Sequence, residues 1–158
     1  MTRPTRDQWA MDIAKITAKR TSCCRRAVGC VLTNSRGHLL STGYNGVAAG
    51  MPHCNEIVVN ILGAETTPWA CPGAHSPSGT NLDGCHALHA EQNALLQCRD
   101  VYQIETAYVT TAPCMTCTKL LLNTSCKEIM YVDDYPQAAE SKKLWESAGR
   151  TWRHYSGQ

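Results

Sequence analysis

The sequence predicts an α/β domain in which helices pack on the faces of a single sheet. From residue 88 onward, apolar runs with helical spacing alternate with short apolar runs typical of buried strands. The chain has 158 residues, which fits one domain. Its hydrophobic content of 43% with 18% charged residues is typical of a globular protein. We therefore expect residues 1–158 to form one domain with its own core.

The N-terminal part predicts one helix followed by two paired strands. Residues 5–19 place apolar side chains at helical spacing, and Thr5 is a suitable N-cap. Residues 27–34 are mostly apolar and indicate a buried strand. After a Ser-Arg-Gly turn, residues 38–44 form its hairpin partner, which we expect to end in a tight turn at residues 43–46.

The stretch 47–88 has no clear periodicity and is rich in Pro, Gly, Cys and His. Within it we expect a short helix at residues 55–62 and a loop at residues 72–84. So long an irregular segment inside a small domain is usually functional. The regular pattern then resumes as helix 88–98, strand 106–111, helix 114–123, strand 128–132, helix 136–148 and strand 151–155.

Charge and hydropathy exclude several classes of partner. The formal net charge of +2 and the lack of a basic stripe argue against a nucleic-acid groove. The one notable basic cluster, Arg20, Arg25 and Arg26, is either a solvated loop or a phosphate contact. There is no apolar run near 18 residues and no charged-then-apolar leader, so we expect no membrane partner and a cytoplasmic location.

The ten cysteines fit a metal framework better than a disulfide framework, because no secretory leader is apparent. Cys30 and Cys98 lie in apolar runs and are expected in the core. Cys114 and Cys117 belong to a motif that binds metal, described next.

Two short motifs carry the chemistry: His89-Ala90-Glu91 and, 25 residues after His89, the run Pro113-Cys114-Met115-Thr116-Cys117. One imidazole and two thiolates give Zn²⁺ three protein ligands, and a catalytic zinc keeps its fourth position for water. Both motifs begin predicted helices, where the helix dipole favours thiolates. Glu91 is close to the metal without being a ligand, which suits a proton shuttle.

Other interpretations exist for each of these motifs. A lone Cys-x-x-Cys is more often half of a structural zinc site or a redox pair. A zinc-binding interaction module has no need for Glu91, and a thiol redox protein has none for His89. The combination of both motifs therefore favours a catalytic zinc.

The motifs resemble those of the zinc-dependent cytidine and deoxycytidylate (dCMP) deaminase family. The resemblance covers roughly residues 5–155 and includes Thr21-Ser22-Cys23, Ser41-Thr42-Gly43-Tyr44-Asn45-Gly46, Pro52-His53-Cys54 and His89-Ala90-Glu91-Gln92-Asn93-Ala94. It implies a three-layer fold with a five-stranded mixed sheet and helices on both faces, assembled as a homo-hexamer. The implied reaction is hydrolysis of dCMP to dUMP and ammonia, which supplies thymidylate synthesis. It also implies activation by dCTP and inhibition by dTTP, with Mg²⁺ accompanying the triphosphate.

The same resemblance implies roles for individual residues. His89, Cys114 and Cys117 would hold the catalytic zinc, while Glu91 would move protons between water, the ring N3 and the leaving amine. The substrate would meet Asn45 at the sugar, backbone near Ala90 at the pyrimidine edge, and Tyr135 at the ring face. From the residues alone, Asn45-Gly46 is equally a hairpin signal and Tyr135 a loop-packing residue. Candidate phosphate or effector contacts are Arg25, Arg26, Tyr44, Gly46 and Arg99.

A second, structural zinc is also expected. Cys23 and Cys54 match thiols that hold such a zinc in some members of the family, and Cys85 and His86 complete the set because they are close to His89. Cys71 and His75 are the alternative ligands, and ordinary buried or free thiols are the competing interpretation. Residues 64–84 vary across the family and receive no role. Deamination of a nucleoside or a tRNA adenosine remains an alternative to dCMP.

Overall fold

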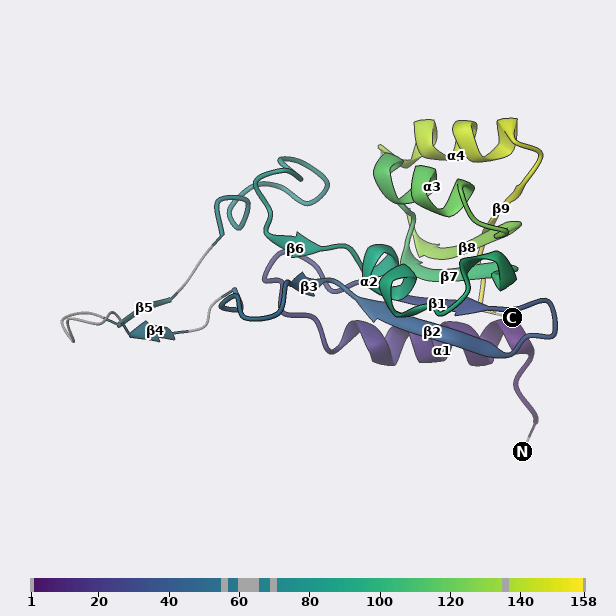
Figure 1. The fold of residues 1–158 in the computed structure, drawn as a ribbon, viewed down its shortest axis with the longest axis horizontal. Coiled ribbons are helices and arrows are strands. Elements are labelled where there is room, and N and C mark those ends of the chain that lie inside the picture. Colours follow the sequence, from purple (N-terminus) through teal and green to yellow (C-terminus); the bar gives the residue numbers. More distant parts are fainter. Residues whose placement is uncertain (1, 55–56, 60–65, 69–70, 135–136, 158) are drawn as a thin grey trace.

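The computed structural model describes residues 2–54, 57–59, 66–68, 71–134 and 137–157 and is built around one five-stranded sheet (Figure 1). The strand order is β2-β1-β7-β8-β9. β1 is antiparallel to β2 and β7, whereas β7, β8 and β9 run parallel. The predicted mixed sheet is therefore confirmed. The strands are β1 (Gly29–Thr33), β2 (Leu39–Tyr44), β7 (Thr106–Thr111), β8 (Glu128–Asp133) and β9 (Thr151–His154).

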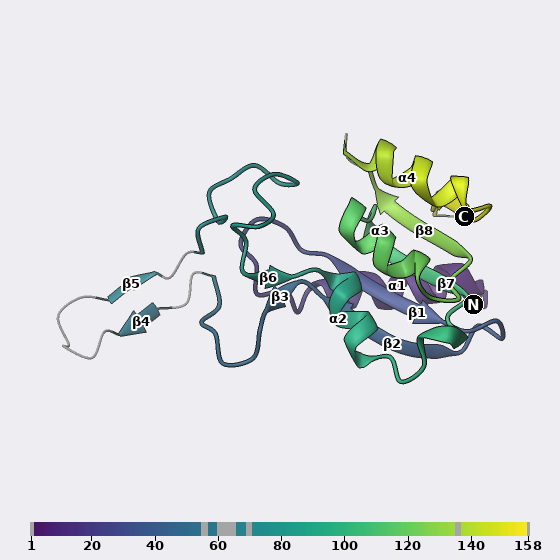
Figure 2. The same ribbon diagram turned by 45° about the horizontal axis from the view of Figure 1, so that its top comes forward.

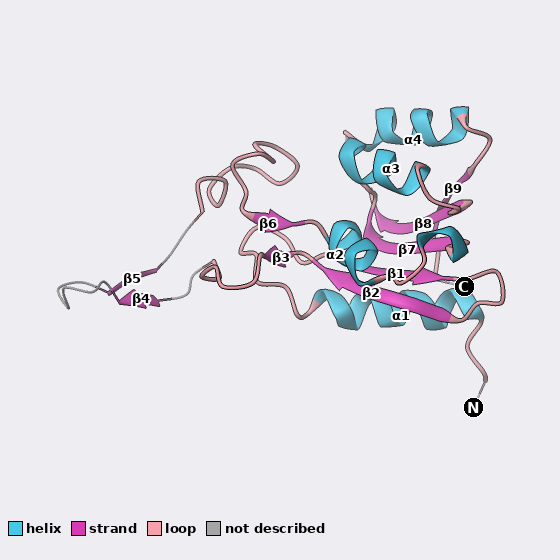
Figure 3. Ribbon diagram, viewed as in Figure 1, coloured by secondary structure: helices cyan, strands magenta, loops and turns pink. Residues whose placement is uncertain are grey.

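Helices cover both faces of the sheet, which gives the three predicted layers (Figure 3). α1 (Arg6–Ala18) packs on one face. α2 (Ala90–Gln97), α3 (Met115–Leu122) and α4 (Ala138–Ser147) pack on the other, and a 3₁₀ turn at Val101–Gln103 follows α2. All of these helices lie within two or three residues of the ranges expected from the sequence.

The central strand β7 shows how the pleat divides the core between these layers. Tyr108 packs with α1 residues, whereas Ala107 and Val109 pack with residues of α2, α3 and α4. Because side chains alternate along a strand, Thr110 faces α1 and Thr111 faces the layer of α2 and α3. Accordingly, the Thr110 hydroxyl accepts a hydrogen bond from the Gly29 N–H at 3.0 Å, on the side where Gly29 meets α1.

α2 lies unusually close to β2, and Gly43 makes this possible. A Cβ atom at Gly43 would come within 2.2 Å of the Ala90 carbonyl oxygen and 2.3 Å of the Ala94 nitrogen. The Ser41 hydroxyl donates to the Ala94 carbonyl at 2.8 Å, and the Asn93 amide donates to the Tyr44 carbonyl at 2.8 Å. The start of α2 is thereby fixed relative to the sheet edge.

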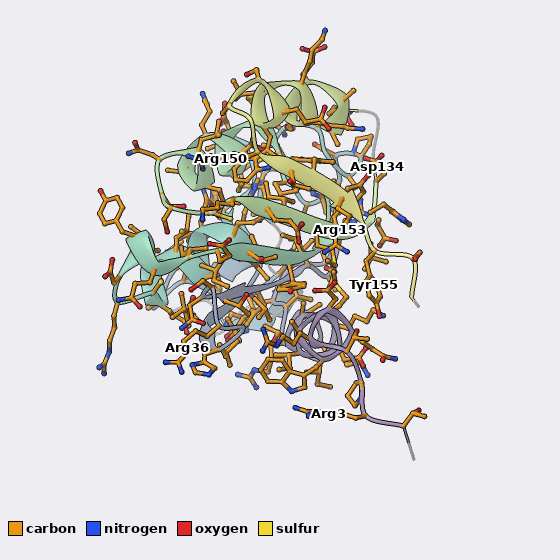
Figure 4. All side chains as sticks on the ribbon, turned by 90° about the vertical axis from the view of Figure 1, so that its right-hand side faces the viewer. Arg3, Arg36, Asp134, Arg150, Arg153 and Tyr155 are labelled. Carbon is orange, nitrogen blue, oxygen red and sulfur yellow. The ribbon has the colours of Figure 1, made fainter. Side chains whose placement is uncertain are left out.

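Two arginines tie the C-terminal elements to the rest of the fold. Arg150 donates to the carbonyls of Leu121, Leu122 and Cys126, which satisfies the C-terminal end of α3. Arg153 bonds Asp7 of α1 and Glu128 of β8. Figure 4 shows Arg150 near the helices and Arg153 near the face that α1 covers.

The irregular segment 47–88 departs from one expectation. The expected helix at 55–62 is wrong at its centre, where β4 (Ile57–Val59) pairs with β5 (Thr66–Pro68) away from the main sheet (Figure 2). Three consecutive β-branched residues favour a strand over a helix. The rest of that range lies outside the described residues.

The tight turn expected at residues 43–46 is also wrong. β2 runs to Tyr44, Asn45 donates its N–H to the Val28 carbonyl, and β3 (Gly46–Val47) continues extended to pair with β6 (Ala87–Leu88). The loop predicted at residues 72–84 is confirmed, since no helix or strand forms there. Within the described ranges, no helix is long and apolar enough to cross a membrane.

We predict that Gly43→Ala displaces α2, because the new methyl group meets backbone atoms that cannot rotate away. Overpacking of this kind costs about 1–3 kcal/mol, and we expect it to weaken metal binding at the same time. The control is Gly50→Ala, which has free space around Cβ but a φ of +85°. It should cost about 1–2 kcal/mol through backbone strain alone. Chemical denaturation and zinc titration measure both effects, and full zinc affinity in Gly43→Ala would contradict the prediction.

Candidate metal centre and active-site pocket

His89, Cys114 and Cys117 meet at one point between α2 and α3. His89 Nδ1 lies 3.4 Å from the Sγ atoms of both Cys114 and Cys117. A tetrahedral Zn²⁺ with ordinary Zn–N and Zn–S bonds requires about 3.5 Å between such atoms. All three ligand atoms lie within 4.8 Å of one another, and no other described group of this kind is as compact. The three residues therefore fit zinc in both chemistry and spacing.

Both helices that carry these ligands begin at a ligand. His89 is the N-cap of α2, and its N–H donates to the Gln92 side chain at 2.8 Å. Cys114 is the N-cap of α3, where its sulfur accepts the Cys117 N–H at 3.5 Å. Two helix N-termini thus point toward one site, and their dipoles favour the anionic thiolates that a metal needs.

The electrostatics of the cluster already favour a thiolate. The Cys117 thiol and the His89 imidazole lower the pKa of Cys114 to about 4, against the opposing effect of burial. The bond to Cys114 raises the pKa of His89 in return. One sulfur is therefore prepared to bind a cation.

Glu91 lies in the first turn of α2 and is only 4% exposed. Burial raises the pKa of its carboxyl to about 7. A carboxyl with a pKa near neutrality can both accept and release a proton, which is the property expected of a general acid–base group.

A pocket opens next to this cluster. It is lined by His89, Glu91 and Cys114, by residues of segment 23–28, and by residues of loop 78–87. Both apolar and polar residues line it, as is common in small-molecule sites. The irregular segment thus forms an outer wall of the candidate active site.

Arg25 holds this wall in place. Its Nη1 donates to the carbonyls of Gly73 and Thr80 at 2.9 Å and to that of Ser76 at 3.4 Å. Its Nε is buried and has no described partner. Arg26 also lines the pocket, and its Nη2 lies 3.7 Å from the exposed carboxylate of Asp133.

Asn45 lines the pocket, but most of its amide is engaged within the chain. Its Oδ1 accepts from the Thr21 hydroxyl and the Val28 N–H, each at 2.8 Å. Its Nδ2 donates to the Arg26 carbonyl at 2.6 Å. One amide hydrogen remains available for a ligand, because an asparagine amide has two. Asn45 therefore orders segment 21–28 as well as facing the pocket.

Of the other residues predicted to contact substrate or effector, some line the pocket and others do not. Ala90 lies in the pocket beside His89, whereas Tyr44 and Gly46 are outside its lining. The Arg20 guanidinium lies over the Tyr44 ring, with its Cζ atom 5.9 Å from the ring centre. Arg99 is exposed in the loop after α2 and does not line the pocket. Tyr135 falls outside the described residues.

The cysteines of the irregular segment gather around Cys71. The Sγ atoms of Cys54 and Cys71 are 3.9 Å apart. Burial raises the pKa of Cys71, but the N–H groups of His86 and Gly73 and the thiols of Cys54 and Cys85 outweigh burial and lower it. Burial raises the pKa of the Cys85 thiol, and the nearby thiols of Cys23 and Cys71 raise it further. The side chains of His75 and His86 are exposed.

Sequence reasoning missed several pocket residues, among them Thr111, Ser78 and Leu82. Thr111 was detectable in principle, because it ends the strand that leads directly to Cys114 and faces the same layer as α2. Ser78 and Leu82 follow no periodic pattern. Their place depends on the Arg25 contacts, which no local signal reveals.

The chain belongs to the family described as the cytidine and deoxycytidylate deaminase zinc-binding region, whose profile matches residues 4–133. This match includes all three residues of the metal cluster and Glu91.

Among similar proteins are deoxycytidylate deaminases of two fungi and a phage. The Schizosaccharomyces pombe protein is 36% identical over 97% of this chain, and the Saccharomyces cerevisiae protein 35% identical over 98%. The chain spans only 45% and 46% of the lengths of these two relatives. The protein of Mycobacterium phage D29 is 36% identical over 83% of this chain and 97% of its own length.

Solved structures support the fold. The dCMP deaminase of cyanophage S-TIM5 in apo form has a TM-score of 0.67 at 20% identity and covers 98% of this chain. Its complex with dCMP and dUMP has a TM-score of 0.70 at 22% identity over the same share. Both chains are covered completely. The three-layer arrangement is therefore that of a deaminase fold.

We predict that Arg25→Ala loosens the pocket wall in the zinc-loaded protein. Hydrogen bonds to a charged donor contribute about 1.5–3 kcal/mol, so amide exchange in residues 71–85 should accelerate about 10- to 100-fold. Arg26→Ala is the matched control and should leave that exchange unchanged, because no bond from its side chain to the loop is seen. Hydrogen-exchange mass spectrometry checks both variants, and equal protection in Arg25→Ala would exclude this role.

Proposed function

We propose that this chain catalyses the hydrolytic deamination of dCMP to dUMP and ammonia. The observation that carries the proposal is the buried Glu91 carboxyl beside the His89–Cys114–Cys117 cluster at a pocket. The proposed substrate follows from relatives named deoxycytidylate deaminase at 35% and 36% identity. The reducing cytoplasm is the proposed place of action, because it keeps zinc-binding thiols reduced.

Zn²⁺ held by His89, Cys114 and Cys117 would act as a Lewis acid that makes water a nucleophile at neutral pH. Glu91 would accept a proton from the attacking water and deliver it to N3 of the pyrimidine while the water oxygen bonds to C4. Glu91 would then take the proton of the new C4 hydroxyl group and pass it to the amino group, so that the C4–N bond breaks, a C4 carbonyl forms and ammonia leaves. A pKa of about 7 suits both directions of transfer.

Cations near the pocket support a substrate with a 5′-phosphate. Arg26 lies in the lining, and its one acidic partner among the described residues is the exposed carboxylate of Asp133, 3.7 Å away. A phosphate dianion competes well for such a guanidinium, since arginine binds phosphate in a bidentate manner. Arg25 adds positive charge to the same wall, although its Nη1 is engaged by loop carbonyls. A nucleoside substrate would not require these charges.

The first prediction of this proposal concerns substrate choice. Ammonia release should be fastest with dCMP when dCMP, dCTP, deoxycytidine and a cytosine-containing oligonucleotide are compared side by side. Release from none of the four by zinc-loaded protein would refute the proposed function. Faster release from deoxycytidine would refute the proposed phosphate contact only.

Two variants control this experiment. Glu91→Gln keeps the shape of the side chain but removes its proton transfer, so turnover should fall about 10²–10⁴-fold while zinc is retained. Glu140→Gln, in the first turn of α4, removes a carboxylate that does not line the pocket and should turn over like the wild type.

We also propose a second zinc, held by Cys23, Cys54, Cys71 and Cys85. The separation of 3.9 Å between the Cys54 and Cys71 sulfurs is close to the roughly 3.8 Å expected for two thiolates on one tetrahedral Zn²⁺. The contacts of Cys71 with Cys54 and Cys85 favour it over the exposed His86 as the fourth ligand. Such a site would tether the irregular segment and contribute directly to folding.

Metal analysis tests this ligand set. Wild-type protein should contain two zinc ions per chain, and Cys71→Ser should lose one while His86→Ala keeps both. The melting temperature should fall only in Cys71→Ser. One zinc per fully active wild-type chain would refute the second site, and loss of zinc in His86→Ala alone would restore the ligand set predicted from sequence.

The proposed assembly is a homo-hexamer. Its support is a set of apolar side chains exposed on α2, α3 and the intervening turn, where Leu96 and Tyr102 are 74% and 73% exposed. Met115 and Leu120 of α3 are also exposed. Contact between subunits would remove these surfaces from water.

We also propose that deoxynucleoside triphosphates regulate the enzyme. dCTP with Mg²⁺ should activate and dTTP should inhibit, through contacts near Tyr44 and Gly46 or at Arg25, Arg26 and Arg99. A typical coupling changes the apparent affinity for dCMP about 5- to 150-fold. Initial rates at subsaturating dCMP measure this, with ATP as the control triphosphate. Rates that respond to neither dCTP nor dTTP would show an unregulated enzyme.

A further inference from the structure

Thr111 carries a hydroxyl group for which the fold supplies no partner. The residue is 7% exposed, and its Oγ1 makes no hydrogen bond within the described residues. Buried hydroxyls in folded proteins are nearly always satisfied, so an exception calls for a reason. Thr111 ends β7 three residues before Cys114 and lines the same pocket as Glu91.

The direction of the side chain follows from the sheet. Thr111 lies on the face that α2 and α3 cover, while the neighbouring Thr110 faces α1 and bonds Gly29. Two other buried hydroxyls, those of Thr118 in α3 and Ser141 in α4, also lack a described partner, but neither residue lines the pocket. Thr111 is therefore the one residue in the described part of the chain that both lines the pocket and carries an unpartnered buried hydroxyl.

Thr111 is placed for the nucleobase rather than for the phosphate. It adjoins Ala112 and lies on the segment that leads into Cys114, whereas the arginines of the lining belong to segment 23–28. A threonine hydroxyl can donate one hydrogen bond and accept others, so it can match a ring carbonyl or a ring nitrogen.

We propose that the Thr111 hydroxyl hydrogen-bonds the pyrimidine ring of the bound nucleotide and positions it against Glu91. This inference rests on the proposed dCMP deamination. It assigns to the pocket a binding residue outside the metal motifs. The Thr111 hydroxyl is unpaired in the free protein and becomes paired only when substrate is bound. Binding therefore removes the unfavourable free energy of a buried unpaired hydroxyl, and this strengthens the affinity for substrate.

Thr111→Val tests the idea because it preserves shape and removes only the hydroxyl. A neutral hydrogen bond of ordinary strength predicts that KM for dCMP and Kd for dUMP both rise about threefold to tenfold. Removing an unpaired buried group should leave the melting temperature unchanged or higher. Thr111→Ser retains the hydroxyl and should bind dUMP like the wild type. Ser141→Ala, which removes an unpaired hydroxyl outside the pocket, should change neither constant.

The outcomes separate this inference from the function on which it rests. An active wild type with unchanged constants in Thr111→Val overturns the role of Thr111 alone. A Thr111→Ser variant as weak as Thr111→Val also overturns it, since packing of the methyl group would then explain the loss. A wild type that releases ammonia from no cytosine compound overturns the proposed function, and this inference with it. Calorimetry with dUMP provides Kd without turnover.

Discussion

The convergence of two helix N-termini on one point is the constraint on which the rest of the structure depends. His89 and Cys114 cap α2 and α3, and both sulfurs lie 3.4 Å from the same imidazole nitrogen. This geometry requires α2 to lie almost in contact with β2, which only a glycine at position 43 permits. A regular core thereby places one imidazole, two thiols and a buried carboxyl close together. The dipoles of both helices favour negative charge there.

The irregular segment has a different relation to the site. It contributes few core side chains, and it is held by Arg25 and by the thiols around Cys71. Gly73 fits against Cys85 with no room for a side chain, so the two ends of the loop are joined closely. A wall held by one guanidinium and a few thiols can change its sequence without disturbing the sheet.

The sequence was sufficient to predict those elements and motifs that depend on residues close together in the chain. Strand 106–111 has the predicted bounds, and the two metal motifs come together as their spacing implied. Long-range contacts decided the rest. Asn45-Gly46 suggested a turn, but pairing of Gly46 with Leu88 keeps the chain extended. Cys71 was only an alternative ligand, because its approach to Cys54 depends on how the loop folds back. The place of Thr111 at the end of strand 106–111 can be read from the sequence, but its unpartnered hydroxyl is a property of the folded structure.

A crystal structure of the zinc-loaded protein, with anomalous diffraction recorded at the zinc edge, tests the central claim most directly. The account predicts a peak between α2 and α3, about 2.0 Å from His89 Nδ1 and about 2.3 Å from the sulfurs of Cys114 and Cys117. Glu91 should remain outside the coordination sphere. A peak bound through Glu91, or no zinc between the two helix N-termini in active protein, would contradict it.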